Sequence, residues 1–466
     1  MLLIVLIVLS STFGKAAQMT QTQRDFLRTQ ITNANAFITD PLVKGEKYSQ
    51  MNTSPSQFYR GAAHLYYADL GNGTITIPSA WKTQPNINIW LSGDFHTQNV
   101  GYSDDKMGKV IFDLNDTDES YIGPFYWDLI RFSTSLYLLT DGISSTHLGD
   151  GSTFSYSASQ QENLVTSFLQ TYQDMLQRVN DHHDETNIQI DESYLQSGFI
   201  QDKLRDLQKK TQADLLKKWT IKTSSGRRFD VTNPQLVPMT NEQRTQFVNN
   251  WTSYTQSLSS SFVASKQRNY FTMKDCARRL HSGLGSLGVG KYYVLIEGES
   301  LSQDNDQILE VKEQMLPSLF KEGSLSLSHY NGWFANHAQR TVVANKALAI
   351  KVDEHLGVLV CDNKSFRVRR LPPCRYGFEI TDFSSKSDVN DFVTYAAKAL
   401  ALAHARADKD YNPTYINYNF EQAYRAAIVR WPQFKTTVNR LSEGYYQQVL
   451  ADYELFTDLF GTGQLG

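Results

Sequence analysis

Two short segments of this 466-residue chain hold the residues best suited to chemistry. Residues 93–99 read Gly-Asp-Phe-His-Thr-Gln-Asn, and residues 113–119 read Asp-Leu-Asn-Asp-Thr-Asp-Glu. Each segment follows a short apolar run of the kind that forms a strand. Carboxylate and amide oxygens packed this closely repel one another unless a cation lies among them, and Mg²⁺ takes such ligands while keeping positions open for phosphate oxygens. We therefore expect a site that handles metal or phosphate, formed by Asp94, Asn99, Asp113, Asp116 and Asp118.

The order and spacing of these motifs resemble the catalytic core of the aminoglycoside-phosphotransferase branch of protein-kinase-like enzymes. The resemblance implies that Asp94 is the catalytic base and that Asn99 and Asp116 bind the metal. Asp113 competes with Asp116 for that role because it lies nearer the end of its strand. We prefer Asp116, since it opens a run that resembles the family's Asp-Phe-Asp-Asp. His96 is expected to orient the catalytic loop by hydrogen bonding rather than to bind metal.

A third motif, residues 123–129, resembles the Gly-Asp-Pro-x-x-Asp-Leu that follows in the same enzymes. Asp128 is then expected to be a structural residue that anchors the catalytic loop. The alternative is that Gly93 and Asp94 form a plain turn, because Asp caps turns and Gly supplies unusual dihedral angles. The two acidic motifs together, in this order, favour a functional site.

The groups that would hold a nucleotide lie far downstream. Residues 283–290, Gly-Leu-Gly-Ser-Leu-Gly-Val-Gly, precede one expected strand at 292–297, and a second expected strand at 308–313 carries Lys312. A Gly-rich turn followed by a Lys in the next strand is the order of a kinase phosphate cradle. Glycines let backbone N–H groups approach phosphate oxygens, and a Lys supplies a point charge. The residues that this order implies for cofactor binding are Gly283, Gly285, Ser286, Gly288 and Lys312.

A Gly-rich turn alone is weak support, since a flexible hairpin has the same composition. Its position after the acidic motifs, rather than before them, predicts a kinase-like fold in circularly permuted order. The chain resembles the domain of unknown function 2252 family (DUF2252) over about residues 45–460, through the two acidic motifs and through residues 54–63, 283–288, 311–313, 337–340 and 401–408. That family name assigns no activity, so the kinase-like interpretation rests on the motifs.

The chain departs from the family pattern in two places. Phe95 stands where an Ala is usual, and Gln98 precedes Asn99 where a Gly is usual. The helix after 337–340 lacks the acidic residue that would pair with Lys312, so Glu313 or Glu354 would have to replace it. A weakened or inactive enzyme is therefore an alternative.

Composition and charge set further bounds. Lys and Arg number 45 against 48 Asp and Glu, a net charge of −3, so no overall basic field points to nucleic acid or a membrane. Residues 1–16 are apolar and then small, which predicts a signal peptide and a chain that is secreted or held in the lumen of a secretory compartment.

Cys361 and Cys374 are expected to form the one disulfide that three cysteines allow. Sequons at Asn52, Asn72, Asn115, Asn250 and Asn363 predict a glycoprotein, with Asn115 unmodified because it lies inside the metal motif.

The hydrophobic pattern predicts an α+β, bilobal protein-kinase-like fold that is rich in helix around a central antiparallel sheet. We expect a helical lobe at 20–265 with the catalytic and metal loops, a strand-rich nucleotide lobe at 266–385, and helices at 386–466 that complete the first lobe. The expected helices are 23–37, 58–70, 126–140, 158–183, 199–219, 241–266, 388–406, 419–430 and 433–455. The expected strands are 87–91, 109–113, a group between 269 and 313, 357–361, 366–371 and 378–381.

We expect a phosphotransferase that uses ATP and Mg²⁺ to phosphorylate a hydroxyl of a small molecule or a protein. One alternative is a metal-dependent phosphoesterase built on Asp94, His96, Asp113 and Asp116. The other is a secreted, non-catalytic binding protein of the pseudokinase kind.

Overall fold

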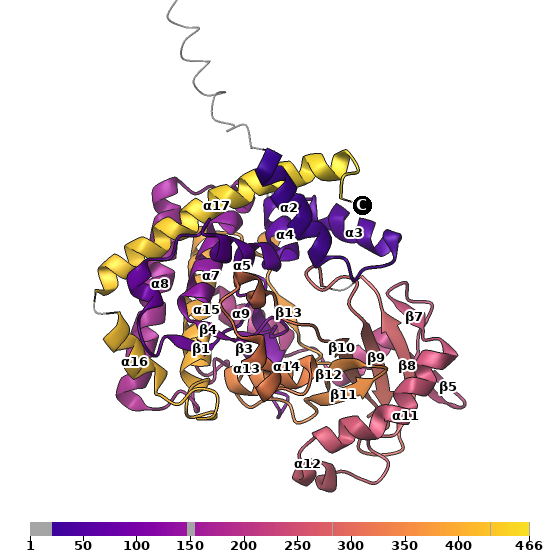
Figure 1. The fold of residues 1–466 in the computed structure, drawn as a ribbon. Coiled ribbons are helices and arrows are strands. Elements are labelled where there is room, and N and C mark those ends of the chain that lie inside the picture. Colours follow the sequence, from indigo (N-terminus) through magenta and orange to yellow (C-terminus); the bar gives the residue numbers. More distant parts are fainter. Residues whose placement is uncertain (1–20, 147–153, 282, 429, 466) are drawn as a thin grey trace, which may run out of the picture.

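The computed structural model describes residues 21–146, 154–281, 283–428 and 430–465. A helical part and a strand-rich part lie side by side (Figure 1), so the predicted mixture of helix and sheet is confirmed. The expected signal peptide, 1–16, lies outside the described residues. Among the helices that the structure describes, none combines the length and the apolar character needed to cross a membrane.

The helical part is built from both ends of the chain. α15 packs on α8, and α17 packs on α7, so segments more than 200 residues apart form one core. α7 buries Trp127, Ile130, Thr134 and Tyr137, as their helical spacing predicts. The helices of this part are α2 (Gln21–Ala34), α3 (Pro41–Met51), α4 (Pro55–Gly61), α5 (Ala63–Asn72), α6 (Ser79–Lys82), α7 (Tyr126–Ser145), α8 (Ala158–His182), α9 (Phe199–Leu207), α15 (Lys386–Arg406), α16 (Phe420–Ala427) and α17 (Trp431–Gly461).

The strand-rich part is a six-stranded antiparallel sheet in the order β11-β12-β10-β9-β8-β7. Its strands are β7 (Leu236–Pro238), β8 (Met273–Arg279), β9 (Lys291–Ile296), β10 (Gln307–Glu313), β11 (Gly357–Cys361) and β12 (Lys364–Arg370). α11 (Asn241–Ser257) and α14 (His337–Leu348) pack on it, and α10 (Gln212–Trp219) and α12 (Ser260–Ser265) add buried side chains to its cores. α13 (Leu327–Trp333) instead packs Tyr330 into the core of the helical part. Successive residues of a strand face opposite sides, so the apolar face of β10 packs under the helices and its other face carries Glu310 and Lys312.

Smaller sheets shape the loops between the two parts. β1 (Asn88–Trp90) pairs with β4 (Ile122–Pro124), and β2 (Val100–Asp104) lies between β3 (Val110–Leu114) and β13 (Tyr376–Gly377). β5 (Thr220–Thr223) and β6 (Gly226–Phe229) form a hairpin. Two short 3₁₀ helices, η1 (Ser318–Glu322) and η2 (Ile380–Asp382), lie in the remaining connections.

Several local expectations differ from the structure, among them the helix expected at 58–70, which is interrupted at Ala62 between α4 and α5. The helix expected at 199–219 is broken, because Thr211 caps a new helix, α10, in a capping box with Asp214. The strand expected at 378–381 is a turn, since the Asp382 carboxylate accepts a hydrogen bond of 2.8 Å from the Glu379 backbone N–H. The helices at 241–265, expected with the helical lobe, supply buried side chains to the core of the sheet.

The predicted disulfide between Cys361 and Cys374 is wrong. Both are free thiols, and so is Cys276. Cys361 packs in the core of the sheet beside α11, whereas Cys374 packs in the core of the helical part, so their burial in different cores keeps them apart.

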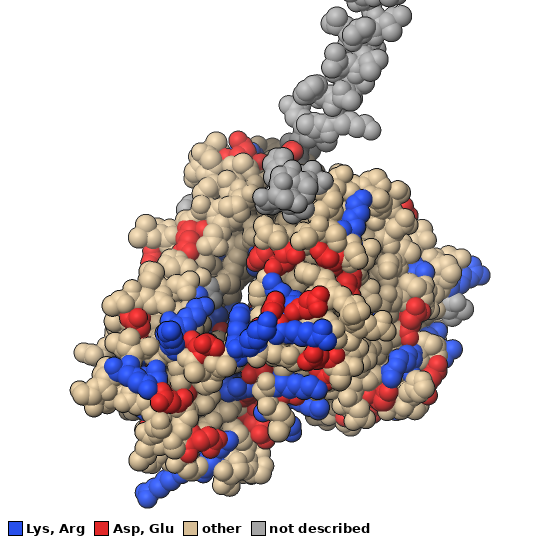
Figure 2. All heavy atoms as spheres, turned by 180° about the vertical axis from the view of Figure 1, so that it is seen from behind, with Lys and Arg blue, Asp and Glu red and all other residues tan. Residues whose placement is uncertain are grey.

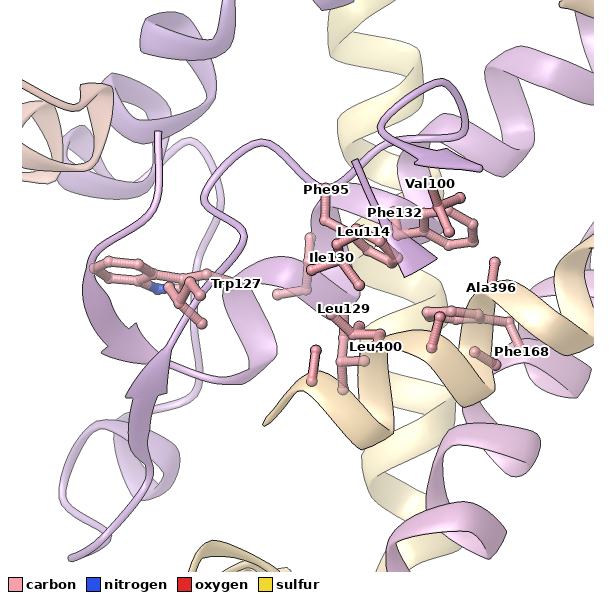
Figure 3. Close-up of a cluster of buried hydrophobic side chains, with 14 of the residues drawn as sticks. Phe95, Val100, Leu114, Trp127, Leu129, Ile130, Phe132, Phe168, Ala396 and Leu400 are labelled. Carbon is pink, nitrogen blue, oxygen red and sulfur yellow. The ribbon is translucent and has the colours of Figure 1, made fainter. Parts of the chain in front are cut away.

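An aromatic layer supports the loop that follows β1 (Figure 3). The Phe95 ring stacks on Phe132 with centroids 4.6 Å apart, and Phe132 contacts Phe168 with centroids 4.5 Å apart. Phe95 is fully buried, so its insertion into the helical core fixes the backbone on either side of it. Asp94 is thereby held at the surface of that core.

Candidate functional site

The loop at 92–99 is anchored from below by Asp128, in the first turn of α7. The Asp128 carboxylate accepts hydrogen bonds from the backbone N–H groups of Ser92 (2.7 Å) and Gly93 (3.1 Å). His404 Nε2 lies 3.3 Å from the same carboxylate, and Tyr172 contacts His404 Nδ1 at 2.9 Å. The prediction that Asp128 is a structural anchor is confirmed by these contacts.

Gly93 is required by the backbone here. Its φ is +82°, and a Cβ would lie 2.0 Å from the carbonyl oxygen of Glu119. The loop before Asp94 therefore lies directly against Glu119, the last residue of the second acidic motif.

Asp94 is held ionised by a buried arginine. Arg131 Nε donates to Asp94 Oδ1 at 2.7 Å, and the Arg131 Nη2 group contacts the same oxygen. The guanidinium is fully buried and lies over the ring of Tyr59, 4.3 Å from its centroid. Burial alone would raise the pKa of Asp94, but Arg131 and then His96 outweigh it and hold the pKa well below its usual range. His96 Nε2 lies 3.6 Å from the other oxygen, Oδ2, and burial lowers the pKa of the imidazole.

Asn99 is tied to the same loop. Its side-chain Nδ2 donates to the Asp94 carbonyl oxygen at 2.9 Å, which turns the amide oxygen away from that carbonyl. The Asn99 backbone N–H donates to the His96 carbonyl oxygen at 2.8 Å. Asp94, His96 and Asn99 all line one cavity.

The candidate metal residues of the second motif separate into two environments. Asp113 points into the helical core, where Arg406 Nη2 lies 3.2 Å from its carboxylate, and it does not line the cavity. Burial raises the pKa of Asp113 despite this partner. Asp116 and Asp118 line the cavity, and the backbone N–H of Asp118 donates to Asp116 Oδ1 at 3.1 Å.

Asp118 is where the two parts of the molecule meet. Its carboxylate forms an ion pair with Lys312 of β10, and Arg367 of β12 lies 3.0 Å from its other oxygen. Burial would raise the pKa of Asp118, but Arg367 and Lys312 hold it well below the usual range. The kinase-like order of the motifs implies that Lys312 lies near the acidic loops, and this ion pair agrees with that expectation. The acidic partner of Lys312 is thus neither Glu313, which pairs with Lys364, nor the exposed Glu354.

α14 fixes the loop that carries Asp118. Arg340 donates to the carbonyl oxygens of Asp118 (2.6 Å), Ser120 (2.9 Å) and Met315 (3.0 Å), and Asn345 donates to the Thr117 hydroxyl at 3.2 Å. The helix that lacks an acidic residue therefore supplies a buried arginine that binds main chain.

The Gly-rich segment forms turns at the edge of the cavity. Gly283, Gly285 and Ser286 line it, whereas Gly288 packs against Ile38, where a Cβ would lie 2.7 Å from Cγ1. Lys47 of α3 donates to the Gly285 carbonyl oxygen at 2.9 Å and ties this turn to the helical part. Burial lowers the pKa of Lys47 to about 8.

The cavity has a volume of about 530 Å³, in the range of roughly 300–1,000 Å³ that is usual for small-molecule sites. Its walls include an apolar set from both parts of the chain, Phe37, Leu284, Val289, Leu316, Phe320 and Leu327. Figure 2 shows the face on which the molecule is hollowed between its two parts, with Lys and Arg side chains facing Asp and Glu side chains across the hollow.

The oxygen ligands available to a cation are few. Among the described residues, no group of three His, Cys, Asp or Glu side chains lies close enough to hold a metal ion. Of the four expected metal ligands, Asn99 and Asp116 line the cavity without an ion pair to any described residue, whereas Asp118 is paired with Lys312 and Arg367 and Asp113 lies outside the cavity. Asn99 and Asp116 fit Mg²⁺, which proteins often hold through one or two side chains together with substrate phosphates and water.

Three functional residues were missed from the sequence. Arg131 had a signal, because a charged residue between apolar neighbours on a buried helix needs a buried partner. Lys47 had a weaker one, since it lies four residues before the buried Met51 on the inner face of α3. Nothing in the sequence indicated that Arg340 binds carbonyl oxygens.

A family model described as "Uncharacterized protein conserved in bacteria (DUF2252)" matches residues 41–459. No curated protein and no solved structure matches the chain significantly.

Proposed function

Because the chain belongs to the DUF2252 family, whose description names no reaction, we propose its function from the cavity: a kinase-like phosphotransferase that moves the γ-phosphate of ATP to a hydroxyl acceptor. One observation carries the proposal. Lys312 of the sheet and the carboxylates of the two acidic motifs meet at a single cavity, beside the Gly-rich turn. Phosphoryl transfer asks a protein mainly for positioning and charge compensation, and these are the groups that supply both.

Asp94 has the position of the residue that receives the acceptor hydroxyl. Arg131 binds Oδ1, which leaves Oδ2 facing His96 at the cavity. A carboxylate with a lowered pKa is a weak base, so its main contribution is to orient the hydroxyl. The acceptor oxygen forms a bond to the γ-phosphorus as the bond to the bridging oxygen breaks, and the hydroxyl proton passes through Asp94 to water.

The other residues divide the phosphate binding among them. Asn99 and Asp116 would hold Mg²⁺, which neutralises phosphate oxygens when it is bound. Gly283, Gly285 and Ser286 would cover the phosphates with the backbone of their turn. Lys312, already desolvated beside Asp118, would exchange part of that ion pair for a phosphate.

Two groups of assays test this proposal. Labelled ATP and Mg²⁺ are incubated with sugars, small alcohols and peptides, and transfer is followed for the wild type and for Asp94→Asn. We expect Asp94→Asn to reduce transfer by about a thousandfold or more while nucleotide affinity changes little. The matched control is Asp202→Asn, an exposed carboxylate outside the cavity, which should change neither quantity. Equal loss of binding and transfer in Asp94→Asn would contradict the assigned role.

A second candidate is a non-catalytic nucleotide-binding protein. The full pairing of Asp118 with Lys312 and Arg367 favours it, because that carboxylate is then not a metal ligand. Thermal stabilisation by ATP with Mg²⁺, without transfer to any acceptor or to water, would identify this case. The phosphoesterase alternative is less well supported, since Asp113 of its proposed set points away from the cavity.

A further inference from the structure

A second charged feature adjoins the cavity on the inner face of the sheet. We call it the cleft cluster; it consists of Lys291, Glu310, Lys312, Arg367, Arg369 and Arg375 with Asp116 and Asp118 of the acidic loop. Lys312, Asp116 and Asp118 also line the cavity, so the two features are continuous.

The strand register places like charges directly opposite one another. In the strand register, Lys312 of β10 lies directly opposite Lys291 of β9 on one side and opposite Arg367 of β12 on the other. Like charges in directly opposed positions destabilise a sheet. This row of three cations therefore needs nearby negative charge.

The protein supplies less negative charge than the cluster contains positive charge. Glu310 is the shared partner of four cations: Lys291 at 2.9 Å, Arg369 at 2.8 Å, Arg367 at 3.2 Å and Arg375 at 3.5 Å. Asp118 serves Lys312 and Arg367, and Asp116 acts on Arg369 and Arg375 from a greater distance. Among the described residues, five cations thus face three carboxylates, an excess of two positive charges.

The pKa values of Lys291 and Arg375 are both lowered, and neighbouring cations contribute to the lowering of each. Burial and then the neighbouring Arg369 lower the pKa of Arg375. Burial, together with the charges of Lys312 and Arg375, lowers the pKa of Lys291 to about 8 despite the attraction of Glu310. Both cations would be stabilised by an added anion.

The cluster has an open side. The side chains of Arg367 and Glu310 are 1% exposed, whereas those of Lys291, Arg369 and Arg375 are 12%, 14% and 30% exposed. Arginine presents a planar fork of donors that matches the oxygens of a phosphate group. A ligand can therefore reach the three partly exposed cations while the buried pair forms the floor.

We infer that the cleft cluster is an anion subsite, in which Arg369, Arg375 and Lys291 bind a phosphate or diphosphate group directly. The inference goes beyond the proposed function, because it requires neither a nucleotide nor a metal. A phosphorylated compound held there would enter the same cleft that Asp94 lines.

Pyrophosphate without divalent cations is the first probe, and glucose 6-phosphate distinguishes a phosphate ester from a free inorganic anion. Binding to the full chain is measured by calorimetry and by thermal unfolding, with NaCl at equal ionic strength as the reference. We expect at least one of the two probes to bind the wild type, and Arg375→Gln to weaken its binding about tenfold or more. Arg375→Lys, which keeps the charge, should restore part of the affinity.

Two further variants locate the effect. Lys44→Met removes a cation of α3 that does not line the cavity, and Lys222→Gln removes an exposed cation from another charged cluster, so neither should weaken binding of the probe. The inference is overturned if neither probe stabilises the wild type beyond NaCl, or if Lys44→Met abolishes binding while Arg375→Gln leaves it intact. Binding of a probe through Arg375 in a protein that does not bind ATP would support the subsite and count against the proposed phosphotransferase alone.

Discussion

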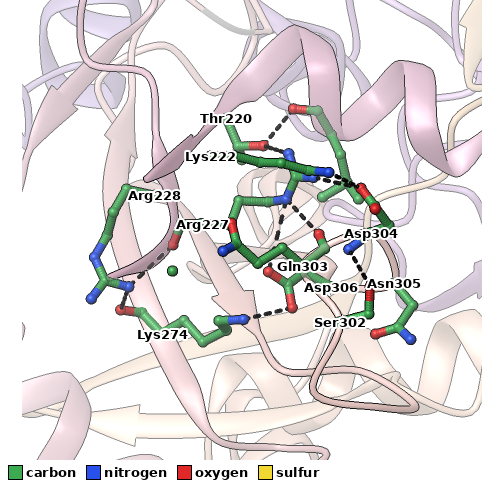
Figure 4. Close-up of polar contacts among 12 residues, drawn as sticks. Thr220, Lys222, Arg227, Arg228, Lys274, Ser302, Gln303, Asp304, Asn305 and Asp306 are labelled. Carbon is green, nitrogen blue, oxygen red and sulfur yellow. Dashed lines mark hydrogen bonds and ion pairs between the residues drawn. The ribbon is translucent and has the colours of Figure 1, made fainter. Parts of the chain in front are cut away.

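Two charged clusters in the strand-rich part of the molecule show how differently buried charge can be compensated. The ion pairs of the outer cluster join three cations, Lys222, Arg227 and Lys274, to three carboxylates, Glu297, Asp304 and Asp306. Figure 4 shows the three cations with Asp304 and Asp306. In the cleft cluster, cations exceed carboxylates. Each cluster has a carboxylate buried at its centre, Asp306 in one and Glu310 in the other.

These two carboxylates respond in opposite directions. Burial raises the pKa of Asp306, and Lys274 only partly offsets it because Glu297 adds a like charge. Burial acts on Glu310 in the same sense, but four cations outweigh it and hold the pKa well below its usual range. Burial alone therefore does not set the direction in which the pKa of a buried carboxyl group shifts. The balance of cations and carboxylates around the group sets it.

The largest expected effect comes from neutralising the centre of the cleft cluster. Glu310→Gln leaves four cations without their shared partner, and we expect it to lower the free energy of unfolding by about 3–5 kcal/mol. Urea unfolding at pH 7 measures the loss. Added phosphate should recover part of it, whereas the same concentration of NaCl should not. A loss below about 1 kcal/mol would show that the cluster is already compensated.

The second prediction concerns how stability depends on pH. The pKa of Glu310 is lowered in the folded protein, so its contribution is present above the unfolded pKa and is lost as the pH falls through the folded value. The destabilisation by Glu310→Gln should therefore shrink below about pH 4.

The pKa of Asp306 is raised, so its contribution to stability is greatest in acid and falls as the pH rises through the folded value. Asp306→Asn should accordingly gain stability relative to the wild type as the pH rises above about 4, and equal slopes for the two variants would refute the comparison.

Lys47 gives a smaller effect of the opposite sign. Because burial lowers its pKa to about 8, holding Lys47 charged at pH 7 opposes folding. Lys47→Met should raise the free energy of unfolding by about 1 kcal/mol, after allowing for the lost hydrogen bond to the Gly285 carbonyl oxygen. Affinity for ATP with Mg²⁺ should fall about tenfold, since the cavity loses a cation. Lys44→Met, on the same helix but outside the cavity, is the control.

The smallest effect is expected at the rim of the outer cluster. The Asp304 side chain is 71% exposed and pairs with Lys222 at 2.6 Å and Arg227 at 3.3 Å. Asp304→Ala should change the free energy of unfolding by less than about 1 kcal/mol, because exposed ion pairs are screened by water and salt. A loss as large as that of Glu310→Gln would show that exposure does not weaken the ion pairs of Asp304.

Much of the fold followed from local pattern. The period of the apolar residues predicted α7 and α8 well, and it predicted the paired strands β11 and β12, because each is a long or regular element with one clear face. The meeting of Lys312 with the acidic loop followed from motif order rather than from periodicity. The false disulfide had no such support: spacing along the chain does not reveal which core a cysteine enters.

The limits of prediction are clearest at the site itself. The acidic motifs identified Asp94, but the state of its carboxylate depends on Arg131, which belongs to another element and is recognisable only by its burial. Charge balance in the cleft cluster could not be predicted either, because its members come from three strands and two loops whose arrangement the sequence does not display. Local chemistry could be read along the chain, whereas compensation between distant groups required the fold.

Arg340 links the position of Asp118 to the arrangement of the two parts. It projects from a helix packed on the sheet, yet it holds the carbonyl oxygens of a loop that belongs to the helical part. If the sheet and its helices moved away from the helical part as a unit, the hydrogen bonds of Arg340 would either break or pull the acidic loop with them. Opening of the cleft and displacement of its acidic loop would then be mechanically inseparable, so a ligand that closes the cleft would also set the geometry of the carboxylate.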